Sequence, residues 1–409
     1  MAINRDKILE YLFYLLSLSF FIGKSYKAVT GVIVLVFLID VIVKRRWDVF
    51  NDPIFIALAC WCSYIFSSAL WAVNPYSAMS SALQVFLWCL LYVAIKSTFI
   101  TKAYIDRYIR VQMIVILFIV ANALIQFIIG FNLFGTPIQA SRVTDLFGHN
   151  RIFAYSFPLW IGFFGALLAL KGQRTKEYLL YGVVLMGMLL TIPLSGARGP
   201  LLLLAIFLPF IAWVSPYRKW AFMALGSFLV ISAVVVSMTP QLQARILTLA
   251  HPFEDQKHTR VSIWLTAFEE FKDNPILGVG FKNFRDRQFE YYKDSFESHE
   301  INPKTGEGQF HAHSPWMDIL AEQGLVGIAF ALFLLFTIAK IVYRSGSVVL
   351  IGSMGVWYSF SLLNSGFSLS SGTWSFFMIL SISVFAMIFN YQKAYLQEKR
   401  PYKSEENVV

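Results

Sequence analysis

The chain has 409 residues, of which 57% are hydrophobic and only 14% are charged, and its mean hydropathy is +0.61. Soluble domains carry about 25% charged residues, so this composition excludes a soluble protein. The apolar runs are continuous and do not alternate, which argues against a transmembrane barrel. The net charge of +10 comes from basic residues in short connectors between these runs, and we therefore expect no nucleic-acid partner. The composition predicts an all-α, polytopic integral membrane protein.

Twelve apolar stretches approach the length that a helix needs to cross a bilayer, and we predict one transmembrane helix over each. They cover approximately residues 8–23, 28–43, 54–72, 79–95, 109–130, 153–170, 178–194, 199–214, 220–238, 316–339, 347–364 and 372–391. Residues 1–409 are expected to form a single membrane domain. Cys60, Cys62 and Cys89 all fall within these stretches, where we expect them to be packing residues and not disulfide partners or metal ligands.

The basic residues predict the orientation of the chain. An even number of spans puts both termini on one side, and cytoplasmic connectors carry an excess of Lys and Arg. Twenty basic residues fall on the terminal side and five in the short connectors of the other side. The five are Lys24, Lys27, Arg142, Arg151 and Arg198. We therefore expect both termini to be cytoplasmic.

One long connector, residues 239–315, lies between the ninth and tenth predicted helices, and we expect it to be external with short helices of its own. Residues 260–271 have helical spacing, with Trp264, Phe268 and Phe271 on one face and Glu269, Glu270 and Lys272 turned elsewhere. Such a helix is predicted to lie along the membrane surface. The Pro and Gly residues of segment 274–280 end it. Ser314 is a natural N-cap for the next helix, with Pro315 at its first position.

Arg198 lies in a connector on the side where positive charge is scarce. It is either an interfacial residue that reaches lipid headgroups or a ligand for an anion. Gly196 and Gly199 allow a close approach to the backbone, and Pro200 is expected to start a helix whose N-terminus favours phosphate. An arginine offers paired donors that match phosphate oxygens. Arg260, at the start of the surface helix, is a second candidate, although a single loop arginine is more often merely exposed.

His311 and His313 flank Ala312 immediately before a predicted helix. They are either a solvated pair or the site of a general base, since an imidazole near an acceptor hydroxyl can take its proton as a bond forms. An extended segment would place both rings on one side. A metal site with His299 and Glu307 is conceivable, but the spacing is not diagnostic and we predict no metal and no cofactor.

Arg142, His149 and Arg151 lie in the other sizeable outside connector, where they either complete an anion pocket or form a polar link. The chain has no phosphate-binding glycine loop, no dinucleotide fingerprint and no Asp-x-Asp pair. These absences argue against chemistry that uses ATP or a metal-held nucleotide sugar.

Three passages resemble the O-antigen ligase and polymerase superfamily of bacterial envelope glycosyltransferases. The connector Ser195-Gly-Ala-Arg198-Gly is similar to the Ser-x-x-Arg-Gly of the family. Arg260 through Trp264 to the Asn-Pro-Ile-Leu-Gly-Val-Gly of residues 274–280 resembles the signature of its external loop. The segment from His313 to Gly327, with Glu322 and Gly324, resembles its His-Asn-x-x-Leu…Glu-x-Gly-x-x-Gly segment. Ser314 stands where the family commonly has Asn.

The resemblance implies an O-antigen ligase in the bacterial inner membrane with a periplasmic active site. Such an enzyme moves a glycan from undecaprenyl pyrophosphate to the lipid A-core oligosaccharide. Carried over residue by residue, Arg198 and Arg260 would bind the pyrophosphate and His313 would activate the acceptor hydroxyl. Arg142, His149, Arg151 and His311 are our further candidates for substrate binding. Two guanidinium groups can stabilise the leaving pyrophosphate without a metal or ATP, and direct attack would invert the anomeric centre.

Other functions stay open at this stage. O-antigen polymerases often have two comparable outside loops, and protein O-oligosaccharyltransferases of this kind are usually longer, so both are less favoured than a ligase. A transporter of lipid-linked sugars is the alternative from another class. Transporters tend to have repeated halves and charged residues near the middle of the membrane, and we find no convincing repeat in this sequence.

Overall fold

The computed structural model describes residues 5–139, 142–144, 146, 147, 152–170, 174–237, 240, 243, 260–291, 311–364 and 366–398. Within these residues the chain is helical and has no strand, only the isolated β-bridges Phe131–Pro137 and Gln139–Arg142. The all-α prediction is therefore confirmed for the described part of the chain.

Each predicted apolar stretch contains helix. The first group is α1 (Arg5–Ser19), α2 (Ser25–Lys44), η1 (Trp47–Phe50), α3 (Pro53–Ser67), η2 (Ser68–Leu70), α4 (Pro75–Thr98) and α5 (Lys102–Ile129). The second group is α6 (Ile152–Ala169), α7 (Thr175–Leu194), α8 (Arg198–Val214) and α9 (Arg218–Ser237). The last is α11 (Arg260–Asp273), α12 (Phe284–Tyr291), α13 (Pro315–Ser345), α14 (Ser347–Gly352), α15 (Met354–Ser359) and α16 (Gly372–Glu398).

Seven of the described helices are long and apolar enough to cross a membrane, namely α2, α3 with η2, α4, α5, α7, α13 and α16. Shorter apolar helices cover Phe153–Ala169, Arg198–Val214 and Ser347–Ser359. The protein is thus a polytopic membrane protein, and the number of twelve spans stays a prediction. One predicted span differs, because residues 347–364 form the two short helices α14 and α15, which meet at Ser353 and end at Ser359.

Local sequence signals explain where several helices begin. Asp52 accepts a hydrogen bond from the main-chain N–H of Phe55 at 3.0 Å and so caps α3, whose first residue is Pro53. Asn74 caps α4 in the same way through the N–H of Ser77 at 3.0 Å. These side chains satisfy main-chain donors that a helix leaves without partners at its first turn.

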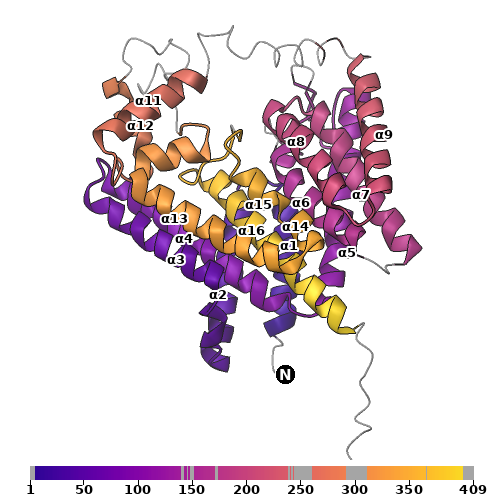
Figure 1. The fold of residues 1–409 in the computed structure, drawn as a ribbon, viewed down its shortest axis with the longest axis horizontal. Coiled ribbons are helices and arrows are strands. Elements are labelled where there is room, and N and C mark those ends of the chain that lie inside the picture. The colour runs from indigo at the N-terminus through magenta and orange to yellow at the C-terminus, as the bar shows by residue number, and fades with distance from the viewer. Residues whose placement is uncertain are drawn as a thin grey trace, which may run out of the picture.

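The helices pack as a bundle in which α16 is central and α13 is peripheral. Most of α16 is buried, whereas less than a third of the apolar part of α13 is fully buried, as is expected for a helix at the edge of a bundle. Figure 1 shows α16 between the group of α2, α3, α4 and α13 and the group of α5, α7, α8 and α9. Aromatic rings pack between α16 and both α2 and α4, with Phe376 against Tyr26 and Trp88.

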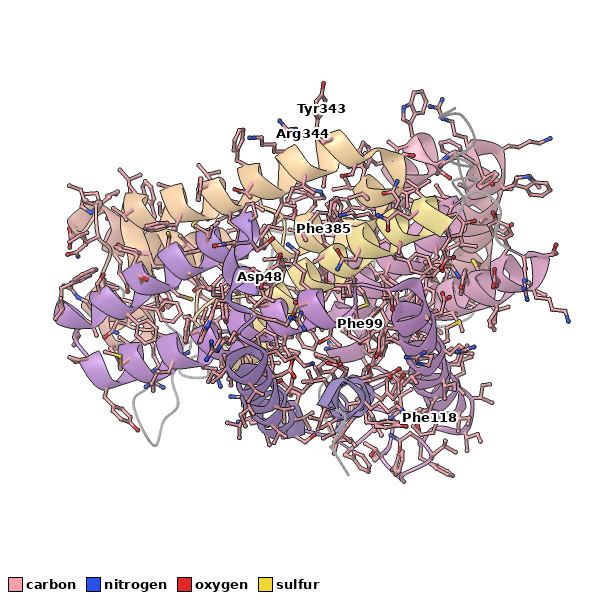
Figure 2. The ribbon with its side chains drawn as sticks, turned by 90° about the horizontal axis from the view of Figure 1, so that it is seen from below. Asp48, Phe99, Phe118, Tyr343, Arg344 and Phe385 are labelled. Atoms are coloured by element: carbon pink, nitrogen blue, oxygen red, sulfur yellow. The ribbon has the colours of Figure 1, made fainter. Side chains whose placement is uncertain are left out.

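The bundle has two ends, which we name by what they carry. The terminal face, lower in Figure 1, carries the N-terminal end of α1 and the C-terminal end of α16. The loop face, at the opposite end, carries α11 and α12. Figure 2 views the molecule from below and shows Asp48, which follows α2, and Arg344, which lies near the end of α13.

Ion pairs join helices near the terminal face. Lys96 of α4 pairs with Asp52 before α3, and Arg107 of α5 pairs with Glu10 of α1. Lys102 at the start of α5 pairs with Glu398 at the end of α16 at 3.9 Å, and also with Asp106 in its own helix. Three of the basic residues that predicted the orientation therefore also hold helix ends together. A paired charge is less costly to bury than a single one.

Candidate active site

The segment 274–280 of the long connector is bound to a break in α13. Four main-chain hydrogen bonds join them: Leu325 N–H to Pro275 O (2.9 Å), Val326 N–H to Ile276 O (3.2 Å), Val279 N–H to Ala321 O (2.9 Å) and Gly280 N–H to Glu322 O (3.0 Å). At the break, main-chain N–H and C=O groups of α13 lose the partners that an unbroken helix would give them. The segment 274–280 supplies their hydrogen-bond partners instead. Two passages that are far apart in the sequence thus form one unit of structure.

Gly324 is the residue at which α13 breaks, and its φ of 59° is unfavourable for residues with a side chain. A Cβ at this position would lie 2.5 Å from the carbonyl oxygen of Ile276. The neighbouring Gln323 is held by α3, because its Oε1 accepts from Trp61 Nε1 at 2.6 Å and its main-chain oxygen accepts from the Tyr64 hydroxyl at 2.7 Å. The two parts of α13 consequently run in different directions (Figure 1), and the first part stays on the loop face.

Ala312, between the two candidate histidines, is buried and is held at both of its main-chain polar atoms. Its N–H donates to Asp318 Oδ1 at 2.5 Å, and its carbonyl oxygen accepts from Trp264 Nε1 at 3.0 Å. Trp264 belongs to α11 and Asp318 to the first part of α13. The His311–His313 segment is therefore fixed by two separate helices.

The two histidine rings contact each other in an edge-to-face arrangement, with centroids 4.2 Å apart. The segment is not extended, because His313 has a left-handed φ of 53°. The N–H of His313 donates to His311 Nδ1 at 3.1 Å. An accepting Nδ1 requires that a neutral His311 ring carry its proton on Nε2. The rings share one side as expected, although through a tight turn.

Ser314 and Pro315 occupy the predicted N-cap and first positions of α13. The Ser314 side chain makes no capping hydrogen bond. Trp316 Nε1 donates to the carbonyl oxygen of Phe360 at 2.7 Å, which ties the start of α13 to the connector between α15 and α16.

Arg198 is the first residue of α8 and is exposed. The prediction that Pro200 starts this helix was wrong by two residues, because the turn before α8 ends earlier. In that turn Gly196 has a φ of 63°, and Ser195 Oγ accepts from the N–H of Ala197 at 3.1 Å. Figure 1 shows the C-terminal end of α9 at the loop face. The short connector 215–217 turns the chain back from α8 into α9, and the two helices pack against each other. The N-terminal end of α8, which begins at Arg198, therefore lies at the loop face as well.

Arg142 lies in the connector between α5 and α6, which is tied to the end of α7. The N–H of Val143 donates to the carbonyl oxygen of Leu194 at 3.1 Å. Gln126 of α5 fixes the same strip of chain, since its Oε1 accepts from the N–H of Thr144 at 2.8 Å. The Nε atom of Arg142 is buried and has no hydrogen-bond partner among the described residues. The structure thus brings the main chains of two candidate connectors together.

The remaining candidates are less completely described. Arg260 is the first residue of α11, but its side chain lies outside the described residues, as do His149 and Arg151 entirely. His299 and Glu307 lie outside as well. Among the described residues there is no group of three or more His, Cys, Asp or Glu residues placed to hold a metal ion.

The buried face of α11 is not the face of Phe268. Ile263, Thr266, Ala267 and Glu270 are buried, whereas Phe268 is 43% exposed. Glu270 is turned away from Phe268, as expected, and it is buried because this side of α11 packs on α13. Phe268 and Phe271 do lie together, with ring centroids 6.0 Å apart.

Sequence reasoning gave no role to Asp318 or to the indole N–H of Trp264. Both lie in the passages that carry the family resemblance, but neither has a spacing that predicts a contact with Ala312. The contact depends on how α11 packs beside α13, which no local pattern encodes. The loop face therefore presents an exposed arginine, a second guanidinium with a buried donor, and a rigidly held histidine pair. Such groups can bind an anion and accept a proton.

Comparison with known proteins agrees with the motifs. Residues 182–332 match the family model described as O-antigen ligase, and this confirms the resemblance over that part of the chain. The matched range contains Arg198, Arg260 and His313, whereas Arg142, His149 and Arg151 lie before it. No curated protein matches the chain. The comparison supports an enzyme of the glycosyltransferase type found in this family.

Proposed function

We propose that this protein is an O-antigen ligase of the bacterial inner membrane. It transfers a glycan from undecaprenyl pyrophosphate to a lipid A-core oligosaccharide on the periplasmic side, with both termini in the cytoplasm. The observation that carries the proposal is the O-antigen ligase match over residues 182–332, which includes the two arginines and the histidine of the motifs. The fixed His311–His313 turn and the Arg198 turn on the loop face support it.

In the proposed reaction, His313 accepts the proton of the acceptor hydroxyl. The hydroxyl oxygen forms a bond to the anomeric carbon of the donor glycan, and the bond from that carbon to the phosphate oxygen breaks. The bonding electrons leave with the undecaprenyl pyrophosphate, whose growing charge is stabilised by Arg198 and Arg260. Arg142 contributes further donors to the same anion, and His149, Arg151 and His311 line the substrate site. A single displacement inverts the anomeric configuration.

The reaction needs no metal, ATP or other cofactor in this proposal, because the lipid-linked donor is already activated. Cationic side chains can carry the charge stabilisation that a metal supplies in other transferases. The partners are the lipid-linked donor, the lipid A-core acceptor and the bilayer itself.

The test combines purified protein in detergent or nanodiscs with lipid-linked O-antigen and a lipopolysaccharide that lacks O-antigen. We expect a product of higher mass that contains lipid A, and we expect a chelator to leave its yield unchanged. His313→Ala should reduce the rate by about 10²–10⁴, the usual contribution of general base catalysis. A longer lipid-linked glycan without transfer to lipid A would identify a polymerase and refute the ligase assignment.

A further inference from the structure

We propose that Trp264 and Asp318 are positioning residues that hold the His313 ring in its reactive place. They do so through their hydrogen bonds to the main chain of Ala312, which we call the grip. The inference rests on the proposed function, since it assumes that His313 is the base. Neither residue touches the substrate in this proposal. They act through the main chain of the residue next to His313.

The grip is complete at Ala312 because both of its polar main-chain atoms are engaged by side chains. The indole N–H of Trp264 donates to the carbonyl oxygen at 3.0 Å, and the Asp318 carboxylate accepts from the N–H at 2.5 Å. The methyl group of Ala312 is buried in a small core with Ile263, Ala267 and Phe284. The residue therefore can neither rotate its peptide groups nor shift along the segment without losing these contacts.

This restraint matters because the next residue has an unfavourable backbone conformation. His313 has a φ of 53°, and a residue with a side chain adopts this region only when its surroundings enforce it. Its N–H is also engaged by His311 Nδ1 at 3.1 Å. The fixed Ala312 thus determines where the His313 main chain starts, and the left-handed turn sets the direction of the ring.

The two gripping residues come from different parts of the chain. Trp264 is on α11 in the long connector, and Asp318 is the fourth residue of α13, in its first turn. Asp318 is buried, with 1% of its surface exposed, so water does not compete for the carboxylate. The position of α11 on α13 is consequently transmitted to the histidine. A displacement of about 1 Å at a reacting group can lower a rate about 10²-fold.

A purely structural grip would have a different consequence. If Trp264 and Asp318 only stabilised the start of α13, their loss would lower the melting temperature and the amount of folded protein. The activity of each folded molecule would stay the same. A positioning role instead predicts a lower kcat at an unchanged KM, since substrate binding does not use these atoms.

The experiment compares two matched pairs of variants in the purified full-length protein. Trp264→Phe removes the indole N–H and keeps an aromatic ring, and Trp220→Phe makes the same change at an exposed position of α9. Asp318→Leu removes the acceptor at similar size, while Asp318→Asn retains an acceptor oxygen. We expect kcat to fall about 10-fold to 100-fold in Trp264→Phe and Asp318→Leu. We expect a clearly smaller loss in Asp318→Asn, unchanged KM values, and a kcat in Trp220→Phe equal to that of the parent.

A double-mutant cycle decides whether the effect passes through His313. In the His313→Ala background, Trp264→Phe should cause no further loss, because the ring that it positions is absent. A second readout without turnover is the rate at which diethyl pyrocarbonate modifies His313, measured by peptide mass spectrometry. This rate should change in Trp264→Phe and Asp318→Leu and stay the same in Trp220→Phe.

The proposal is overturned if kcat per folded molecule is unchanged in Trp264→Phe and Asp318→Leu. It is also overturned if the effects of Trp264→Phe and His313→Ala on kcat multiply independently and the modification rate of His313 is the same in all variants. The proposed function can fail separately. Full activity of His313→Ala would refute the base assignment, and the modification rate would still report whether the grip fixes the ring.

Discussion

The main-chain N–H of Val143 donates to the carbonyl oxygen of Leu194 at 3.1 Å and so joins the connector after α5 to the end of α7. Val143 follows Arg142, and Leu194 precedes the turn that ends at Arg198. Two arginine-bearing connectors that are about 50 residues apart in the sequence therefore share one support. We therefore expect a substitution in either connector to alter the position of the arginine in the other.

Arg142→Lys tests whether this second guanidinium binds the donor. Lysine keeps the charge but lacks Nε and the planar pair of donors. We expect the KM for the lipid-linked donor to rise about 10-fold or more, since a hydrogen bond to a charged group contributes about 1.5–3 kcal/mol. Steady-state kinetics with varied donor measure this, and Arg344→Lys at the exposed end of α13 is the control (Figure 2). An unchanged donor KM would remove Arg142 from the site.

Ser195→Ala tests the turn that leads to Arg198. The buried Ser195 hydroxyl accepts from the N–H of Ala197 at 3.1 Å and donates to the carbonyl oxygen of Ile192 at 2.6 Å. Losing these bonds should destabilise the protein by about 1–3 kcal/mol. It should also raise the KM for the donor, because the turn directly precedes Arg198 and sets the position of its main chain. The exposed Ser80→Ala is the matched control. Thermal unfolding and donor KM measured on the same samples check both parts, and an unaltered KM would show that the turn does not orient Arg198.

Gly324→Ala should destabilise the contact between the long connector and α13. The φ of 59° and the close carbonyl oxygen of Ile276 both disfavour a Cβ there. We expect a loss of at least about 1–3 kcal/mol, the usual cost of a strained backbone conformation. The control is Gly31→Ala in α2, where a Cβ would have nothing within 4 Å. Apparent melting temperatures in detergent measure the difference, and equal values for the two variants would contradict the prediction.

The orientation of the protein is tested by labelling single cysteines. With Cys60, Cys62 and Cys89 replaced by Ala, cysteine is introduced in Ile276→Cys or Tyr343→Cys, at positions that are 63% and 90% exposed. Intact cells whose outer membrane has been made permeable are treated with a maleimide that does not cross the inner membrane. We expect Ile276→Cys to react at once and Tyr343→Cys only after cell lysis. The reverse pattern would place the loop face in the cytoplasm and would refute a periplasmic site.

The apolar stretches, the start of α13 at Ser314 and Pro315, and the position of α11 follow from local patterns. Hydrophobicity over about twenty residues and the pairing of the first main-chain donors of a helix depend on neighbours in the sequence. For the same reason the motifs with Arg198 and His313 could be recognised before any contact was known. The sequence also indicates that both candidates lie in connectors and not inside spans.

Other features depend on which segments meet in space. The break at Gly324 needs the carbonyl groups of segment 274–280 as partners, and Glu270 is buried because α11 packs on α13. The grip of Trp264 and Asp318 on Ala312 and the hydrogen bond from Val143 to Leu194 arise in the same way. Hydrogen bonds between distant segments leave no periodic signal in the sequence. The amino-acid sequence by itself therefore determined only the helices and the candidate groups. The tertiary structure decided how those groups are held, because only packing brings their partners within bonding distance.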